Sequence, residues 1–271
     1  MKRTHPSALA SGAVLAACLG CVASCANTNS AGPANRTMET VHVRLPAGAA
    51  DVDVYWPDAA RPAPMVVIAH GFSRSRHNMS GWGQHLASAG FVAVVPDLPA
   101  LSDHARNGRF LSDLRAHFAT GSSWKMRIDP ARVALMGFSA GGLSSLLSAA
   151  ESPGVALWIG LDPVDRGDMG VKAATLLKAR AVVITAEPSP CNARGNAKGI
   201  VAALPRGEHF RVAGAVHVDA EWPTSWLAEL VCGRSSEDKR QAFVARATHA
   251  LQEALAAPPS NAERPGARSG P

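Results

Sequence analysis

The stretch RVALMGFSAGG at residues 132–142 decides the fold class of this 271-residue chain. After Arg132 it is apolar enough for a strand with both faces covered, and a helical pattern follows it. The G-x-S-x-G between them is typical of a sharp strand-to-helix turn that exposes its serine above a sheet. Glycine leaves room at 137 and 141, where a side chain would collide with neighbouring backbone. The stretch therefore predicts that Ser139 is a nucleophile beside a helix N-terminus, whose dipole favours developing negative charge.

Apolar runs alternate with longer amphipathic stretches on both sides of this turn. Near-continuous apolar runs, typical of parallel strands buried on both faces, lie at 65–69, 91–95, 132–136, 155–161, 181–185 and 210–215. Runs that alternate in polarity, as in an edge hairpin, lie at 41–45 and 51–55. Helical patterns lie at 79–89, 103–118, 141–150, 171–178, 194–204, 220–231 and 236–256.

This alternation predicts an α/β domain over residues 37–256, with a doubly wound, mostly parallel eight-stranded sheet and helices on both faces. Only about twenty residues separate the strand ending at 161 from the strand beginning at 181, so we expect no large lid. The tail over 257–271 is rich in proline, glycine, alanine and serine, and we expect it to be disordered.

Composition and charge exclude several classes of protein. Hydrophobic residues make up 47% and charged residues 18% of the chain, which excludes a disordered protein. The net charge is +6, but the basic residues are scattered without a basic block, which argues against a nucleic-acid partner. One segment alone, residues 8–22, is apolar enough to concern a membrane, so a polytopic protein is excluded.

The N-terminus has the pattern of an export signal. Lys2 and Arg3 precede the uncharged run 8–22, which is short and rich in small residues, so we expect a signal peptide over 1–25. The mature protein is then exported, either periplasmic or secreted.

Two segments, LAAC at 15–18 and VASC at 22–25, resemble the lipobox of bacterial lipoproteins. The resemblance implies cleavage before a cysteine and lipidation of it. We favour Cys25, because a polar tether over 26–36 follows it directly. The protein would then contact a membrane only through this N-terminal lipid anchor. The alternative is ordinary cleavage near Ala26, which gives a soluble secreted protein.

Two cysteines remain in the body of the chain, Cys191 and Cys232. An even pair in an oxidising compartment predicts one disulfide, the alternative being two buried free thiols. Neither has a neighbouring ligand pattern such as C-x-x-C, so the sequence predicts no metal site.

The strand expected at 65–69 runs into His70, Gly71 and Phe72. Its end brings backbone amides to the same sheet edge as the nucleophile. We expect the amides of Phe72 and Ala140 to form an oxyanion hole. His70 directly precedes the glycine, and we expect it to brace this loop by hydrogen bonds rather than act as a base.

A serine nucleophile needs a histidine base and a carboxylate, which follow it in the order acid, then histidine. His217 follows the strand expected at 210–215 at its carboxyl end, and we assign it as the base. His209 would precede that strand at the wrong end, and His249 lies in a helical pattern.

Three carboxylates follow strands at the same edge. Asp162 comes directly after an apolar strand that would bury it, so it needs a partner such as the histidine. Glu187 lies on the strand that carries the acid in many enzymes of this fold, and Asp165 is a third candidate. We favour Asp162 and keep Glu187 and Asp165 as alternatives.

With these residues, the chain resembles the α/β-hydrolase superfamily over nearly its whole mature length. The chlorophyllase-like and platelet-activating-factor acetylhydrolase-like esterases are most similar. The chlorophyllase motifs H-G-Y/F, G-H-S-R-G-G, I-D-P-V-D and G-H-L-D correspond here to HGF at 70–72, GFSAGG at 137–142, LDPVD at 161–165 and VHVD at 216–219. The resemblance implies that Asp162 is the acid.

The sequence departs from those motifs at three positions. Phe138 and Ala140 replace the histidine and arginine of the elbow, and Val216 replaces a glycine, which argues against chlorophyll as the substrate. The chain also resembles polyester-cleaving cutinase-like hydrolases, which share the elbow and the first loop. That family typically carries its acid one strand later than Asp162.

The sequence thus predicts an exported serine hydrolase of carboxylic esters that forms an acyl-enzyme and requires no metal or organic cofactor. The substrate is a small-molecule, lipidic or polymeric ester. Two alternatives stay open. One is a non-catalytic envelope lipoprotein that binds a lipidic ligand, and the other is a peptidase or thioesterase with the same triad.

Overall fold

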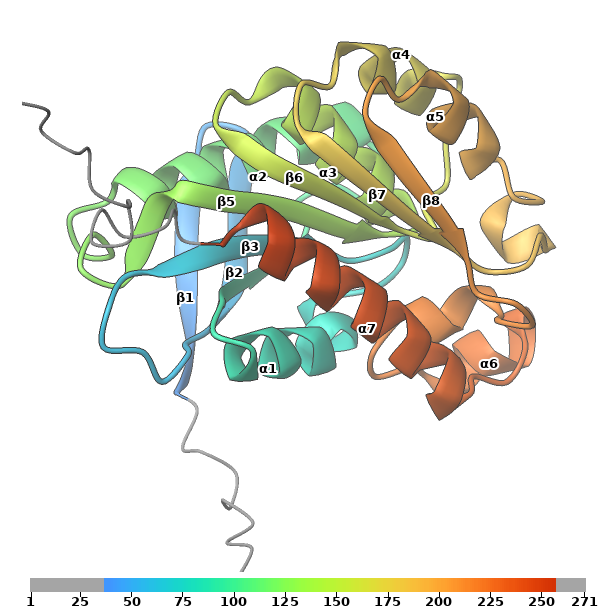
Figure 1. Cartoon of the computed structure of the whole chain (residues 1–271), viewed down its shortest axis with the longest axis horizontal. Coiled ribbons are helices and arrows are strands. Elements are labelled where there is room, and N and C mark those ends of the chain that lie inside the picture. The colour runs from blue at the N-terminus through green and yellow to red at the C-terminus, as the bar shows by residue number, and fades with distance from the viewer. Residues whose placement is uncertain (1–36, 257–271) are drawn as a thin grey trace, which may run out of the picture. The chain divides into compact units, whose positions relative to one another are not determined.

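A computed structural model describes residues 37–256 (Figure 1). The expected signal peptide, the tether with Cys25, and the C-terminal tail lie outside these residues. The described chain forms one sheet in the order β1-β2-β4-β3-β5-β6-β7-β8. Its strands are β1 (Met38–Leu45), β2 (Gly48–Tyr55), β3 (Ala63–Ala69), β4 (Val92–Pro96), β5 (Ile128–Phe138), β6 (Val155–Leu161), β7 (Arg180–Thr185) and β8 (Gly207–Arg211). The expected α/β-hydrolase fold with eight strands is confirmed.

The sheet is antiparallel at one edge and parallel elsewhere. β1 pairs with β2 and β2 with β4 in antiparallel registers, while the strands from β4 to β8 pair in parallel. Every residue of β3 and β4 is buried. A strand covered on both faces needs apolar side chains at successive positions, which explains the continuous apolar runs in the sequence.

Helices cover both faces of the sheet (Figure 1). They are α1 (Ser80–Ser88), α2 (His104–Thr120), α3 (Ala140–Glu151), α4 (Met169–Leu176), α5 (Ala197–Ala203), α6 (Trp226–Cys232) and α7 (Glu237–Ala254). Val67 on β3 packs in one core cluster with residues of α2 to α5, whereas its neighbour Val66 packs in another with residues of α1 and α7. Among the described residues, no helix is long and apolar enough to cross a membrane.

Two sequence predictions near the C-terminal end were wrong. The strand expected at 210–215 is β8 at Gly207–Arg211, which pairs with β7 as the edge strand. Most of its residues are exposed, so apolarity did not mark it. The helix expected at 220–231 begins only at Trp226, because Pro223 interrupts the helical pattern and Ser225 caps α6 by accepting from the Ala228 amide.

The helix expected at 194–204 is also shorter. It begins at Ala197, because Ala193, Arg194 and Gly195 all have positive φ angles (50°, 56° and 71°) that no right-handed helix accommodates.

The disulfide between Cys191 and Cys232 is confirmed, with Cα atoms 5.7 Å apart. Cys191 lies in the short 3-10 helix η2 (Pro190–Asn192), and Cys232 ends α6. The bond therefore joins the loop after β7 to the helix that follows the His217 segment.

We expect loss of this disulfide to destabilise the fold. It spans 41 residues, and the chain-entropy relation gives about 3 to 4 kcal/mol for a loop of that size. The Cys191→Ser/Cys232→Ser double variant should show that loss of unfolding free energy in urea titrations. Dithiothreitol should destabilise wild type in the same way and leave the double variant unchanged. Equal urea midpoints for wild type and the double variant would contradict the prediction.

Candidate active site

Ser139 lies in the turn between β5 and α3 with a strained backbone. Its φ and ψ are 54° and −121°, values that a residue with a side chain adopts only when its surroundings enforce them. The Ser139 amide donates to the Leu161 carbonyl (3.0 Å), and the Ser139 carbonyl accepts from the Val164 amide (3.2 Å). Bonds to the end of β6 and the loop beyond it thus hold the elbow in place.

Glycine is required on both sides of Ser139. A Cβ at Gly141 would lie 2.2 Å from the His70 carbonyl oxygen, and one at Gly137 would lie 2.3 Å from the Gly141 carbonyl oxygen. Both distances are far inside van der Waals contact with backbone that cannot move aside. The close packing brings the loop after β3 against the start of α3.

The structure brings Ser139, His217 and Asp162 together. His217 Nε2 is 2.9 Å from Ser139 Oγ, and His217 Nδ1 is 2.6 Å from Asp162 Oδ2. All three residues are buried, with 8%, 5% and 1% of their surfaces exposed. The Phe138 ring packs on the imidazole with centroids 4.7 Å apart. The sequence therefore identified the three residues that the fold places in line.

The Asp162 carboxylate is held by more than the histidine. Its Oδ1 accepts from the Ala186 amide (3.1 Å), and its Oδ2 also accepts from Asn192 Nδ2 (3.0 Å). Asn192 is 1% exposed, and its Nδ2 donates as well to the Glu187 carbonyl (2.8 Å). A buried carboxylate with these donors has the hydrogen bonds that burial demands.

Sequence reasoning missed Asn192. It is a lone amide in a polar loop, and its only signal was its place beside Cys191 of the expected disulfide. Its Oδ1 accepts from the Ser189 amide (2.8 Å) and the Gly195 amide (3.0 Å), so the loop fixes the side-chain orientation.

The two alternative acids do not contact His217. Glu187 Oε1 accepts from the Gly214 amide at 3.2 Å. Asp165 accepts from the backbone amides of Arg166, Gly170 and Val171, where it caps the first turn of α4. Both are loop carboxylates satisfied by backbone, so the geometry favours Asp162.

The other histidines considered in the sequence analysis have structural contacts. His209 lies within β8, not before it, and its ring hydrogen-bonds Thr185 Oγ1 at 2.9 Å. His249 is exposed on α7 beside Glu253. His70 bonds to the Gly71 carbonyl through Nδ1, and its Nε2 accepts from the Leu98 amide, both at 2.9 Å. Burial lowers the pKa of His70, which keeps the ring neutral and able to accept; His70 braces the loop as expected.

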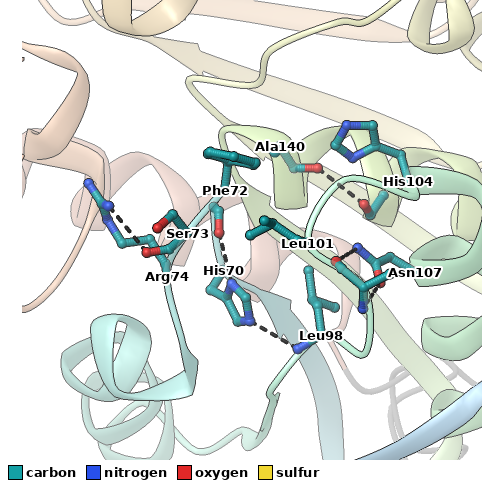
Figure 2. A pocket seen from close by; sticks show the side chains of 12 residues that line it. His70, Phe72, Ser73, Arg74, Leu98, Leu101, His104, Asn107 and Ala140 are labelled. Carbon is teal, nitrogen blue, oxygen red and sulfur yellow. Dashed lines mark hydrogen bonds between the residues drawn. The ribbon is translucent and has the colours of Figure 1, made fainter.

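Two adjoining cavities open beside the elbow. The larger, about 340 Å³, includes Ser139, and the smaller, about 180 Å³, lies against the loop after β3. Phe72, His104 and Ala140 line both of them, and Figure 2 shows the smaller. Phe72 is 53% exposed, so its ring lines the cleft rather than the core.

Phe72 and Ala140, whose amides we expect to form the oxyanion hole, both line these cavities. Ala140 is the first residue of α3, so its amide has no acceptor within the helix. Phe72 lies in the loop after β3, lines the same cavity and is beside Ala140 in Figure 2. Within residues 37–256, no group of three or more His, Cys, Asp or Glu side chains is arranged to hold a metal ion.

A largely buried ion pair borders the smaller cavity, which Arg74 lines. Glu221 follows the segment that carries His217, and its Oε1 is 2.6 Å from Arg74 Nε, which follows the Phe72 loop. The two groups are close enough for an ion pair but are not aligned for a hydrogen bond, and neither carboxylate oxygen has a hydrogen-bonding partner within residues 37–256. Burial raises the pKa of Glu221 to about 7, and Arg74 and Arg240 offset this in part.

We expect this carboxyl to make stability depend on pH. Its folded pKa lies above its usual 4.5, so the folded state binds more protons and wild type loses stability as pH rises from about 4.5 to about 7. Relative to wild type, Glu221→Gln should therefore gain stability across that range, by at most about 3 kcal/mol.

Urea titrations of both proteins at pH 4.5, 6 and 8 measure the effect. The exposed Glu151→Gln is the control for loss of one carboxylate. A constant difference between Glu221→Gln and wild type at all three pH values would rule out a raised pKa at Glu221.

Comparison with known proteins agrees with this geometry. Residues 21–252 match the family described as "PETase: PET hydrolase-like". The bis(hydroxyethyl) terephthalate hydrolase of Streptomyces coelicolor is 28% identical over 189 residues, which are 66% of this chain and 61% of that protein. Cutinase 1 of Thermobifida cellulosilytica is 28% identical over 137 residues, 49% of this chain and 52% of that protein.

The chain thus spans about half to three fifths of the length of these relatives. A solved dienelactone hydrolase from Anabaena variabilis superposes with a TM-score of 0.65 at 18% identity, covering 81% of this chain and 99% of that one. This similarity shows the shared fold. The family match covers most of the chain, including the elbow, the Asp162 strand end and His217, and the protein belongs to the PET hydrolase-like family of α/β-hydrolases.

Proposed function

We propose that this protein is a serine hydrolase of carboxylic esters. The observation that carries the proposal is the line of contacts from Ser139 Oγ through His217 to Asp162, at 2.9 and 2.6 Å. A nucleophile within hydrogen-bonding reach of a base, which a carboxylate orients in turn, is the arrangement that activates a serine.

In the proposed reaction, Ser139 Oγ attacks the acyl carbon while His217 Nε2 takes the hydroxyl proton. Asp162 stabilises the imidazolium, and the amides of Phe72 and Ala140 donate to the carbonyl oxygen as it becomes negative. His217 returns the proton to the leaving alcohol, which leaves an acyl-enzyme. Water then attacks the acyl carbon with His217 as base, and Ser139 regains its proton as the acid leaves.

Asn192 and the Ala186 amide act in this reaction through Asp162. They fix both carboxylate oxygens, so that Oδ2 faces His217 Nδ1. This fixes which imidazole nitrogen carries the proton, and Nε2 is left free to accept from Ser139. We assign Asn192 as a positioning residue.

Carboxylic esters are favoured over amides and thioesters because of the relatives. Both carry names that describe ester hydrolysis, of bis(hydroxyethyl) terephthalate and of cutin. Polyesters and their soluble diester fragments are therefore proposed substrates. The non-catalytic alternative is disfavoured by the short His217–Ser139 contact, since a binding protein does not need that alignment.

We also propose that the protein acts outside the cytoplasm. The leader pattern over residues 1–25 supports export, and the Cys191–Cys232 disulfide supports an oxidising compartment. Attachment through a lipid on Cys25 remains the proposed form of membrane contact.

We expect a fluorophosphonate probe to label wild type with one adduct per chain, seen by intact mass. Ser139→Ala should give no adduct and should lower kcat/KM on p-nitrophenyl butyrate at least about 1,000-fold, because the nucleophile is lost. The surface variant Ser88→Ala is the control and should be labelled. Full hydrolysis by Ser139→Ala would overturn the proposed function.

A second prediction concerns the acid. Asp162→Asn should lower kcat on the order of 10⁴-fold, because an amide at this position favours the wrong imidazole tautomer. Glu187→Gln should stay within a few-fold of wild type, because its carboxylate bonds only to a backbone amide. Steady-state rates on p-nitrophenyl butyrate compare the two. A larger loss in Glu187→Gln than in Asp162→Asn would transfer the acid to the end of β7.

A further inference from the structure

The wall shared by the two cavities contains a histidine that the proposed reaction does not use. His104 is the first residue of α2, is 7% exposed, and lines both cavities beside Ser139. The start of α2 is capped by Asp103, which accepts from the Arg106 amide, so the helix does not need the imidazole. The His104 side chain is therefore not needed to cap the helix.

One ring nitrogen of His104 is buried without a partner among the described residues. This nitrogen is Nδ1, which makes no hydrogen bond with any part of the chain that the structure describes. Figure 2 places the ring beside Ala140 at the cavity wall, with no hydrogen bond to the other lining residues drawn. Nε2 has no hydrogen bond within the described residues either, but it is not fully buried, so it is the ring nitrogen that a molecule bound in the cavities can reach.

The surroundings of His104 determine which partner fits. Burial and the positive charge of Arg166, on the wall of the larger cavity, lower the pKa of His104, while Asp103 opposes them weakly. The nearby Asp165 carboxylate is occupied by three backbone amides. The ring is therefore neutral near pH 7 and offers one N–H donor, which can bond an uncharged carbonyl oxygen without a change in its own protonation.

We propose that His104 is a specificity-determining residue that donates a hydrogen bond to a second, uncharged oxygen of the substrate. The proposal rests on the proposed ester hydrolysis at Ser139. It predicts that the site prefers esters carrying a further carbonyl oxygen over esters of the same shape without one. A donor at that oxygen favours the substrate that supplies it by the free energy of one neutral hydrogen bond.

The test compares dimethyl esters with alkyl analogues of the same shape. The diesters are dimethyl succinate, glutarate and adipate, and their analogues are methyl 4-methylhexanoate, 5-methylheptanoate and 6-methyloctanoate. The measured quantity is the ratio of kcat/KM for each diester to that for its analogue. Comparing this ratio between variants cancels the intrinsic reactivity of the esters.

We expect His104→Leu to lower the ratio about three- to tenfold for at least one chain length, the effect of one neutral hydrogen bond. His104→Gln, which keeps a neutral donor, should recover part of the preference. His117→Leu, at an exposed position on the same helix, is the matched control and should keep the wild-type ratio.

An unchanged ratio in His104→Leu at all three chain lengths, whether or not the two rates fall together, would overturn this assignment while leaving ester hydrolysis in place. No hydrolysis of any of the six esters by wild type would overturn the proposed function as well.

A binding measurement independent of turnover uses the Ser139→Ala protein with ¹⁵N-labelled histidine. Dimethyl glutarate should shift the ring nitrogen resonances of His104 and methyl 5-methylheptanoate should not. Equal shifts with both esters would contradict the proposal.

Discussion

The hydrogen bond between Asp162 Oδ2 and His217 Nδ1 joins the end of β6 to a segment 55 residues later in the chain. It places a carboxylate where only 1% of the residue is exposed, so every other lone pair of that carboxylate must find a donor in the protein. The end of β7 supplies one through Ala186, and the η2 loop supplies another through Asn192. A single buried charge thus dictates how four separate segments meet.

The sheet supplies the rigidity that this arrangement needs. Ser139 and Asp162 both have positive φ angles, 54° and 42°, and both directly follow parallel strands. The Ser139 amide bonds to the Leu161 carbonyl, and the Asp162 amide bonds to the Ile184 carbonyl (2.7 Å). Each strained residue is therefore tied to the neighbouring strand, and strain at the site is held by hydrogen bonds continuous with the sheet.

Whether the sequence predicted an element correctly depended on whether a local pattern of residues marks that element. The elbow is marked locally, because Gly137, Ser139 and Gly141 lie within five residues of one another. Buried strands are indicated by apolar runs. β8 and the start of α6 were misplaced because an exposed edge strand has no apolar signal and Pro223 interrupts an otherwise helical pattern.

The sequence did not indicate the contacts of Asn192 and Glu221, for another reason. Each is an ordinary polar residue whose importance comes from a contact made across the fold, with Asp162 and Arg74 respectively. No local pattern records such a contact. Asp162 was marked by its place directly after an apolar strand, whereas nothing in the sequence marked Arg74.

The position of the acid depends both on the local sequence and on contacts made across the fold. The resemblance to cutinase-like hydrolases implies an acid one strand later, where this chain has Glu187, yet Asp162 faces His217 here. The two strand ends are adjacent: β6 pairs with β7, and the Ala186 amide at the end of β7 reaches Asp162 Oδ1. The ends of β6 and β7 therefore lie close to the same imidazole, although only the β6 carboxylate contacts it among the described residues. When β6 supplies the carboxylate, the β7 end is left to supply donors instead, and its backbone amide together with Asn192 does so. The contacts around the imidazole thus fix where the negative charge lies, and in this chain the end of β6 carries it.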